Sequence, residues 1–221
     1  MAKIIDLTMP IENHFRWPVE RKLVGDFERG DAFQVTWIGM GVHGFTHIDS
    51  PRHMVPLGET SSEVALDRVV GDAVVVDLSG IKPNTAISVE SLEKNSPEVI
   101  AGDIVLLRAA WDLVESYKTP EFWTRAPYMT KEACEWLMAR KVKAVGFDFP
   151  QDYPIRGLLK GKKASMSEFI THDVLLRQGI ILIEYLCNLS MISGNRTTLV
   201  ALPIKLPDAD GAPARVIALN S

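Results

Sequence analysis

The sequence predicts a mixed α/β fold in one domain that covers residues 1–221. Two features support this prediction: short apolar, β-branched runs gather towards the ends of the chain, and similar runs alternate with helical patterns in the middle. Regular alternation throughout would indicate a purely parallel, doubly wound sheet, whereas strand-rich ends favour a mixed sheet. The chain has no internal repeat and no linker-like stretch, so we expect one compact unit.

Seven runs have the composition of β-strands. Each is short and rich in aliphatic or β-branched residues, and each is bounded by Gly, Pro, Asn or Asp, which favour turns. The predicted strands are residues 33–38, 73–78, 103–109, 142–147, 180–186, 199–204 and 215–219.

Three segments between these runs carry helical signals. Residues 88–94 form the first. Thr130 is the expected N-cap of the second, KEACEWLMARK, in which apolar residues recur at helical spacing. The third is expected to start at Ser165, which has capping-box spacing to Glu168, and to end before Gly179, a residue suited to the left-handed conformation after a helix.

The composition limits the classes of function. The 28 Asp and Glu residues outnumber the 24 Lys and Arg, and a net charge of -4 argues against sequence-independent binding of nucleic acid. No apolar run approaches the roughly 18–20 residues that span a bilayer, and the first ten residues lack the apolar core of a secretory signal. Cys134 and Cys187 form no CxxC pattern, which argues against a thiolate zinc site and favours a reducing compartment. We therefore expect a cytoplasmic protein without nucleic-acid or membrane partners.

Residues 156–163 contain Arg156, Lys160, Lys162 and Lys163 with two glycines among them. The simplest interpretation of this basic segment is a solvated, mobile loop. The alternative is that the positive charge attracts an anionic substrate.

Three of the five histidines fall within eleven residues, 43–53, which read HGFTHIDSPRH. His43, His47, Asp49 and His53 all have odd numbers, so an extended backbone would project the four side chains from one face. Imidazole and carboxylate groups are suitable ligands for zinc, manganese or iron, and two histidines with one carboxylate leave positions open for water and substrate. The sequence therefore predicts a catalytic type of metal site. The alternative is a polar strand with solvated histidines.

Two further candidate ligands lie in the C-terminal half. His172 is the only later histidine, and Glu184 interrupts the apolar run IILIEYL. A carboxylate buried in such a run costs several kcal/mol or more unless it is paired or binds a cation. A metal would satisfy Glu184. The alternatives are that Glu184 points outward from an edge strand, or that it pairs with an arginine such as Arg177 or Arg196.

Segment 43–53 resembles the pattern His-x-Gly-Thr-His-x-Asp-x-Pro-x-His of the metal-dependent cyclase-like hydrolases, the family of bacterial kynurenine formamidase and isatin hydrolase. The later His172, the Gly-Ile pair at 179–180 and Glu184 resemble the second motif of that family. The opening IDLT and the Trp-Pro pair at 17–18 are also similar to the family, so the resemblance covers most of the chain.

The resemblance implies a swivelling β/β/α-type fold and a homodimer or homotetramer in which a neighbouring subunit can help close the active site. It implies one or two Zn²⁺ or Mn²⁺ ions per subunit and the hydrolysis of a small-molecule amide, either an aryl formamide such as N-formylkynurenine or a lactam such as isatin. The isatin hydrolase branch is described as using one manganese ion. By the same resemblance, one ion is held by His43, His47 and Asp49 and a second by Asp49, His172 and Glu184, with His53 as the acid/base.

Phe45 departs from the family pattern, which has glycine at this position. On an extended backbone the Phe45 ring would lie on the metal face, where it lines the pocket or tucks beneath the ligands, and we expect Phe45 and Trp17 to contact substrate. Asp148 is either a partner of the metal ligands or part of an ordinary turn after a strand.

Two other interpretations compete with a hydrolase. Residues 39–44 match GxGxxG, but a proline seven residues further on argues against the helix that binding of a dinucleotide requires. A metal-binding family member that senses or stores a ligand without catalysis would keep the ligands and have no requirement for His53.

Overall fold

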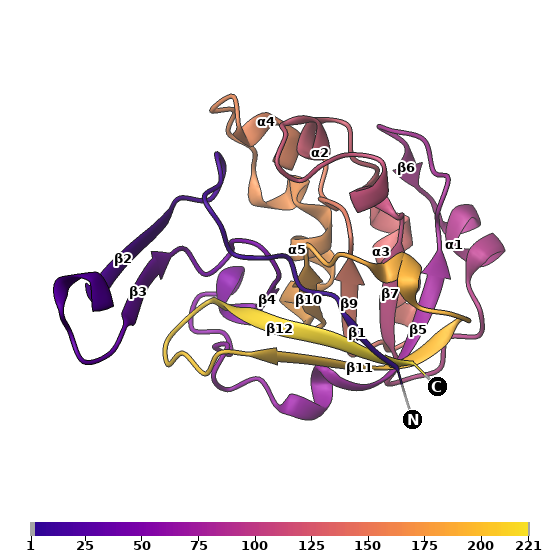
Figure 1. The fold of residues 1–221 in the computed structure, drawn as a ribbon. Helices are drawn as coiled ribbons and strands as arrows, with labels where there is room; N and C mark the ends of the chain where they lie inside the picture. Colours follow the sequence, from indigo (N-terminus) through magenta and orange to yellow (C-terminus); the bar gives the residue numbers. More distant parts are fainter. Residues whose placement is uncertain (1–2, 221) are drawn as a thin grey trace.

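The computed structural model describes residues 3–220 and is built around an eight-stranded mixed sheet that closes into a barrel-like layer (Figure 1). The strand order is β1-β12-β11-β5-β7-β9-β10-β4. The strands are β1 Lys3–Asp6, β4 His47–Asp49, β5 Val70–Asp77, β7 Ile104–Arg108, β9 Ala144–Phe147, β10 Ile181–Glu184, β11 Arg196–Pro203 and β12 Gly211–Asn220.

Strand β12 closes the sheet because it is long enough to pair with three others. One edge of β12 pairs with β11, while the other pairs with β4 through residues 211–213 and with β1 through residues 217–220. Strands β5, β7, β9 and β10 run parallel, and β4 is antiparallel to β10. Closure leaves few unpaired strand edges.

The two faces of the sheet supply two apolar cores, because side chains alternate along each strand. On β5, Ala73 and Val75 lie in the core inside the barrel, and Val74 and Val76 lie in the core beneath the helices. Figure 1 shows the helices gathered over the parallel strands, on the side away from β11 and β12. The helices are α1 Val89–Asn95, α2 Glu121–Thr124, α3 Lys131–Ala139, α4 Ile155–Leu158 and α5 Ile170–Val174.

The first two predicted helices form as the sequence indicates. Ser88 caps α1 by accepting a hydrogen bond from the Ser91 N–H, and Thr130 caps α3 by accepting one from the Ala133 N–H. The seven predicted strands also form, with ends shifted by a few residues. Among the residues that the structure describes, no helix is long and apolar enough to cross a membrane.

The predicted helix from Ser165 to Gly179 is wrong as one continuous element. The capping box of Ser165 and the left-handed Gly179 are both present, but the segment divides into a 3-10 turn, α5 and a second 3-10 turn. The reason is a side chain from elsewhere: the Asp152 carboxylate accepts hydrogen bonds from the N–H and the hydroxyl of Thr171, so the backbone starts a new helix there.

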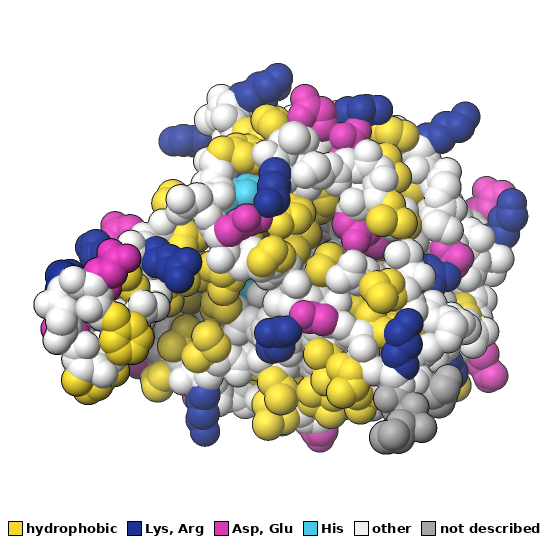
Figure 2. All heavy atoms as spheres, in the orientation of Figure 1, with side chains coloured by type: hydrophobic (Ala, Val, Ile, Leu, Met, Phe, Trp, Pro, Cys, Tyr) yellow, Lys and Arg dark blue, Asp and Glu magenta, His cyan; other side chains and the backbone are white. Residues whose placement is uncertain are grey.

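A long hairpin projects from the body of the molecule. Only its second strand is predicted from the sequence. The hairpin consists of β2 Val19–Gly25 and β3 Val35–Met40, which pair only with each other (Figure 1). Strand β2, VERKLVG, has too little apolar alternation to be predicted as a strand. Figure 2 shows hydrophobic side chains on this hairpin, where Phe27 and Phe33 are 64% and 68% exposed.

Asp148 belongs to a turn after β9. Its buried carboxylate accepts hydrogen bonds from the N–H groups of Ala109 and Ala110, at 2.9 and 2.8 Å. These bonds fix the chain where β7 ends, so the turn interpretation of Asp148 holds. Burial raises the pKa of Asp148 to about 8, although the two N–H groups lower it.

The raised pKa of Asp148 predicts how stability depends on pH. The folded state binds this proton more tightly than the unfolded chain, whose Asp has a pKa of about 3.9, so the stabilising contribution falls as pH rises from about 4 through about 8. We therefore expect the protein to lose stability relative to Asp148→Asn, which cannot ionise, between about pH 5 and pH 9. Urea denaturation of both proteins measures this difference, and a pH-independent difference would contradict the prediction.

Candidate metal centre

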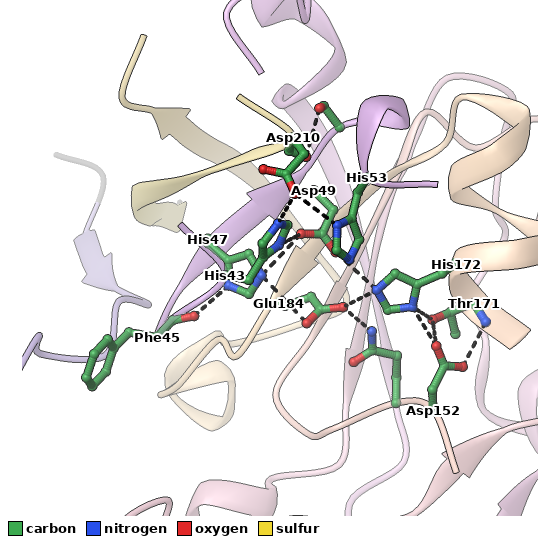
Figure 3. Close-up of polar contacts among 12 residues, drawn as sticks. His43, Phe45, His47, Asp49, His53, Asp152, Thr171, His172, Glu184 and Asp210 are labelled. Carbon is green, nitrogen blue, oxygen red and sulfur yellow. Dashed lines mark hydrogen bonds and ion pairs between the residues drawn. The ribbon is translucent and has the colours of Figure 1, made fainter. Parts of the chain in front are cut away.

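The candidate ligands meet where β10 ends beside β4. In the antiparallel register, Glu184 pairs with His47 and Leu182 pairs with Asp49. His47 and Asp49 are two residues apart, so they and Glu184 project from the same face of the sheet. His172 reaches this face from α5, and Figure 3 shows the four side chains pointing toward one another.

His43 and His53 reach the same place by a different route from the one the sequence predicted. The extended backbone is limited to β4; His43 lies in the turn before this strand, and His53 ends the 3-10 helix Pro51–His53. The alternation of side chains along an extended backbone therefore explains the positions of only His47 and Asp49. The turn and the 3-10 helix fold the other two rings over the cluster, with the ring centroids of His43 and His53 4.0 Å apart.

The imidazoles of His47 and His172 are oriented to offer a lone pair to a cation. Nδ1 of His47 donates to the Phe45 carbonyl at 2.8 Å, and Nδ1 of His172 donates to the Asp152 carboxylate at 2.6 Å. In each neutral ring this leaves Nε2 as the acceptor, the arrangement that partners of metal-bound histidines commonly impose.

The two Nε2 atoms face carboxylate oxygens at distances suited to a shared ion. Nε2 of His47 is 3.2 Å from Asp49 Oδ1 and 3.7 Å from Glu184 Oε2. Nε2 of His172 is 3.3 Å from Asp49 Oδ2 and 3.4 Å from Glu184 Oε1. Asp49 therefore faces His47 with one oxygen and His172 with the other.

Two polar atoms in the cluster lack a hydrogen-bond partner. Both His47 Nε2 and Asp49 Oδ2 are buried and make no hydrogen bond to any part of the described chain. Buried polar atoms are rarely left without a partner, because the loss of hydration costs about 1–3 kcal/mol each. A divalent cation would satisfy both, and nitrogen and carboxylate donors suit zinc or manganese, so the residues present fit a metal.

The charges of the cluster point to the same conclusion. Burial and the charge of Asp49 raise the pKa of Glu184, because two carboxylates lie close together away from water. Burial alone would favour the neutral acid at Asp49, but positive charge on the neighbouring histidines would hold the pKa of Asp49 well below its usual range. A cation between the carboxylates would relieve their repulsion.

His43 contacts two carboxylates at once. Its Nδ1 is 2.7 Å from Asp49 Oδ1, and its Nε2 is 2.9 Å from Oδ2 of Asp210. Burial opposes a charge on this ring, yet the hydrogen bonds and charges of the two aspartates raise the pKa of His43 to about 9. As a metal ligand, His43 would release the Nδ1 proton and keep its Nε2 bond to Asp210.

His53 has one fixed nitrogen and one free nitrogen. Its Nδ1 donates to Asp210 Oδ2 at 3.2 Å, which leaves Nε2 as the proton acceptor. Burial lowers the pKa of His53, so the ring favours the neutral, basic form. His53 lies beside the cluster, with its ring centroid 5.5 Å from that of His172.

The alternatives for Glu184 do not apply, since Arg177 pairs with Asp173 and Arg196 pairs with Asp103. Glu184 instead accepts a hydrogen bond from the Gln151 amide. Sequence reasoning missed three residues that contact the cluster: Gln151, Asp152 and Asp210. Gln151 and Asp152 follow β9 in a turn, where the parallel strands deliver polar residues to one edge, and that signal could have found them.

A cavity of about 820 Å³ opens over the cluster. Its floor contains the predicted ligands and His53, and its wall is mainly apolar, with Trp17 and Phe169 among the lining residues. Trp17 therefore lies where a substrate would contact it. Tyr185, which is buried, also borders the cavity, 5.6 Å from His47 between ring centroids.

The expectation that Phe45 lines the pocket is wrong. Its backbone adopts φ of 57°, a left-handed conformation that favours glycine and turns the side chain off the metal face. The ring is fully buried against Trp17 at 4.8 Å and His14 at 5.7 Å between centroids, and Figure 3 shows it pointing away from the cluster. The buried Phe45 ring thus packs against Trp17, which lines the cavity.

Comparison of the sequence with models of known protein families identifies the family of this chain. The Cyclase family model, described as "Putative cyclase", matches residues 5–151, more than half of the chain. The chain belongs to the cyclase family. The resemblance of residues 43–53 to that family is thereby confirmed.

This cyclase-family chain is similar to relatives named kynurenine formamidase. The kynurenine formamidase of Bacillus thuringiensis (strain Al Hakam) is 26% identical over 218 residues, which are 96% of this chain and 95% of the relative. The kynurenine formamidase of Erythrobacter litoralis (strain HTCC2594) is 29% identical over 208 residues, 91% of this chain and 86% of the relative.

Solved structures share the fold of this cyclase-family chain. One described as a "Potential Metal-Dependent Hydrolase With Cyclase Activity" superposes with a TM-score of 0.77 at 28% identity and covers 100% of this chain and 99% of its own. Isatin hydrolase A from Ralstonia solanacearum superposes with a TM-score of 0.81 at 22% identity, covering 100% and 92%. The mixed α/β fold predicted from the sequence is confirmed.

Proposed function

We propose that this protein is a metal-dependent hydrolase that cleaves the C–N bond of a small linear or cyclic amide, such as an aryl formamide or a lactam. The observation that carries the proposal is the convergence of His47, Asp49, His172 and Glu184 on one point at the floor of an apolar cavity. The names of the relatives, kynurenine formamidase and isatin hydrolase, support this class of reaction.

One or two Zn²⁺ or Mn²⁺ ions would be held by His43, His47 and Asp49 and by Asp49, His172 and Glu184. When bound, such an ion polarises a carbonyl oxygen and lowers the pKa of water from 15.7 toward about 7. Around it, Asp152 keeps the proton on Nδ1 of His172 and the Phe45 carbonyl does the same for His47, so both rings stay oriented.

His53 moves the proton in this proposal. Its Nε2 accepts a proton from the attacking water and delivers that proton to the leaving nitrogen, while Asp210 holds Nδ1–H and thereby the orientation of the ring. The apolar wall, including Trp17 and Phe169, binds an aromatic ring and excludes bulk water. A protein that only stored a metal would have no use for the basic nitrogen of His53 beside the ligands.

The test is hydrolysis of a panel of formanilides, isatin and small lactams by protein purified without chelators. We expect cleavage of at least one member, loss of cleavage after chelation, and recovery on addition of Zn²⁺ or Mn²⁺. Full activity in metal-free protein would contradict the mechanism, and no cleavage across the whole panel would contradict the substrate class.

We further propose a homodimer or homotetramer working in the cytoplasm. The projecting hairpin, with exposed aromatic residues such as Phe33 and Trp37, supports contact with a second copy of the chain, since large exposed apolar side chains favour association. Both cysteines are free, which supports a reducing compartment. Light scattering that returns the mass of a single 24.5 kDa chain would contradict the first proposal, and cell fractionation tests the second.

A further inference from the structure

Arg16 lines the cavity over the candidate metal centre and has no partner for its charge among the described residues. Among the described residues that line the cavity, Arg16 is the only lysine or arginine. It forms no ion pair with any described residue, and its guanidinium lies 5.3 Å above the centroid of the Trp123 ring. This half-buried charge faces a wall that is otherwise apolar.

Hydrogen bonds to the His14 ring fix the backbone at Arg16. Its N–H donates to Nδ1 of His14 at 3.1 Å, and Nε2 of the same ring donates to the Tyr117 carbonyl at 2.8 Å. Burial lowers the pKa of His14, so the neutral ring required by this arrangement is favoured. The turn therefore presents Arg16 and Trp17 together to the cavity.

Arg16 and the candidate metal centre share one cavity. His47, Asp49, His172 and Glu184 line this cavity together with Arg16. Tyr185 borders the cavity next to His47. A substrate whose amide lies at the cluster can therefore extend toward Arg16.

The basic segment borders the same cavity. Leu158 and Leu159 line it, and Lys160, Lys162 and Lys163, which follow in the chain, are exposed and make no ion pair within the described residues. Arg156 differs, because its guanidinium bonds to Asn84 and to backbone carbonyls. In a chain with a net charge of -4, these unpaired positive charges lie on a segment that borders the cavity over the candidate metal centre.

We propose that Arg16 binds a carboxylate carried by the substrate at the end remote from the amide, and that the three lysines attract this anion. The proposal rests on the proposed function and deepens it: the substrate carries a negative charge at the end remote from its amide, which a neutral lactam lacks. A guanidinium matches a carboxylate with two parallel hydrogen bonds, and a partly desolvated arginine favours a ligand that pairs with it. The lysines attract the anion electrostatically over a longer distance, and salt screens this attraction.

The test measures binding rather than turnover. Isothermal titration calorimetry compares 4-phenylbutanoate with 4-phenylbutanamide, which differ only in the charge of the end group. We expect the protein to bind the carboxylate about tenfold more tightly than the amide, Arg16→Gln to remove that preference, and Arg16→Lys to restore part of it. Arg21→Gln, at an exposed arginine of the hairpin away from the cavity, is the matched control and should change neither affinity.

Three results would overturn the proposal. The protein could bind the two probes equally, Arg16→Gln could weaken both to the same extent, or the preference for carboxylate could vanish on chelation of the metal while surviving Arg16→Gln. The last result would place the carboxylate on the metal centre. Because these titrations need no turnover, failure to cleave the amide panel would count against the proposed function without altering this readout.

Discussion

Asp49→Asn should lose its metal and, with it, more than about 10³-fold of the hydrolytic activity. Asp49 faces His47 and His172, one carboxylate oxygen to each, and it also contacts Nδ1 of His43. An Asn side chain offers a single acceptor oxygen, and its NH₂ group would point at a nitrogen or at a cation. Metal content by elemental analysis and turnover of the best amide in the panel measure the two losses together.

Asp72→Asn is the control for the Asp49 variant, because Asp72 is an exposed aspartate on β5 that does not line the cavity. It should keep both metal and activity. Circular dichroism of Asp49→Asn checks that the fold is retained. A folded Asp49→Asn protein with full metal content and full turnover would show that Asp49 does not bind the cation.

His53→Gln should lower kcat by about 10² to 10⁴ while the metal content stays constant. The reason is that His53 lies beside the ligands with a free Nε2, whereas its other nitrogen is bonded to Asp210. Glutamine keeps similar size and polarity but cannot accept and release a proton near neutral pH. Steady-state kinetics together with elemental analysis separate loss of acid/base catalysis from loss of metal.

A second variant makes the role of His53 more specific. Added imidazole should restore part of the turnover of His53→Ala, since the small base can enter the space that the side chain leaves in the wall of the cavity. Unchanged kcat in His53→Gln at constant metal content would instead favour the non-catalytic, ligand-storing interpretation of the same site.

Local sequence signals predicted much of the fold. The helix predicted at residues 88–94, the cap at Thr130 and the left-handed Gly179 depend on neighbouring residues, and they form as predicted. The helix after Ser165 was mispredicted because Asp152, which comes from a different part of the chain, bonds Thr171 and restarts the backbone. Closure of the sheet by β12 is equally non-local, so periodicity could not predict it.

At the candidate site, too, local signals were informative and contacts between distant parts of the chain could not be predicted. Pattern and spacing singled out six residues that the structure brings together around one cluster, although only β4 has the extended backbone assumed for the whole segment. The position of the Phe45 ring could not be predicted from the alternation of side chains along a strand, because the positive φ of Phe45 reverses the direction of the side chain. Asp210 gave no signal of its own: it lies in the turn before β12 and meets His43 and His53 only after the sheet closes.

Anomalous diffraction at the zinc and manganese absorption edges, from crystals of protein purified without chelators, tests the central claim most directly. The account predicts at least one anomalous peak inside the cluster, in contact with Asp49 and with Nε2 of His47 or His172. Fully active crystals with no peak at this position would contradict it.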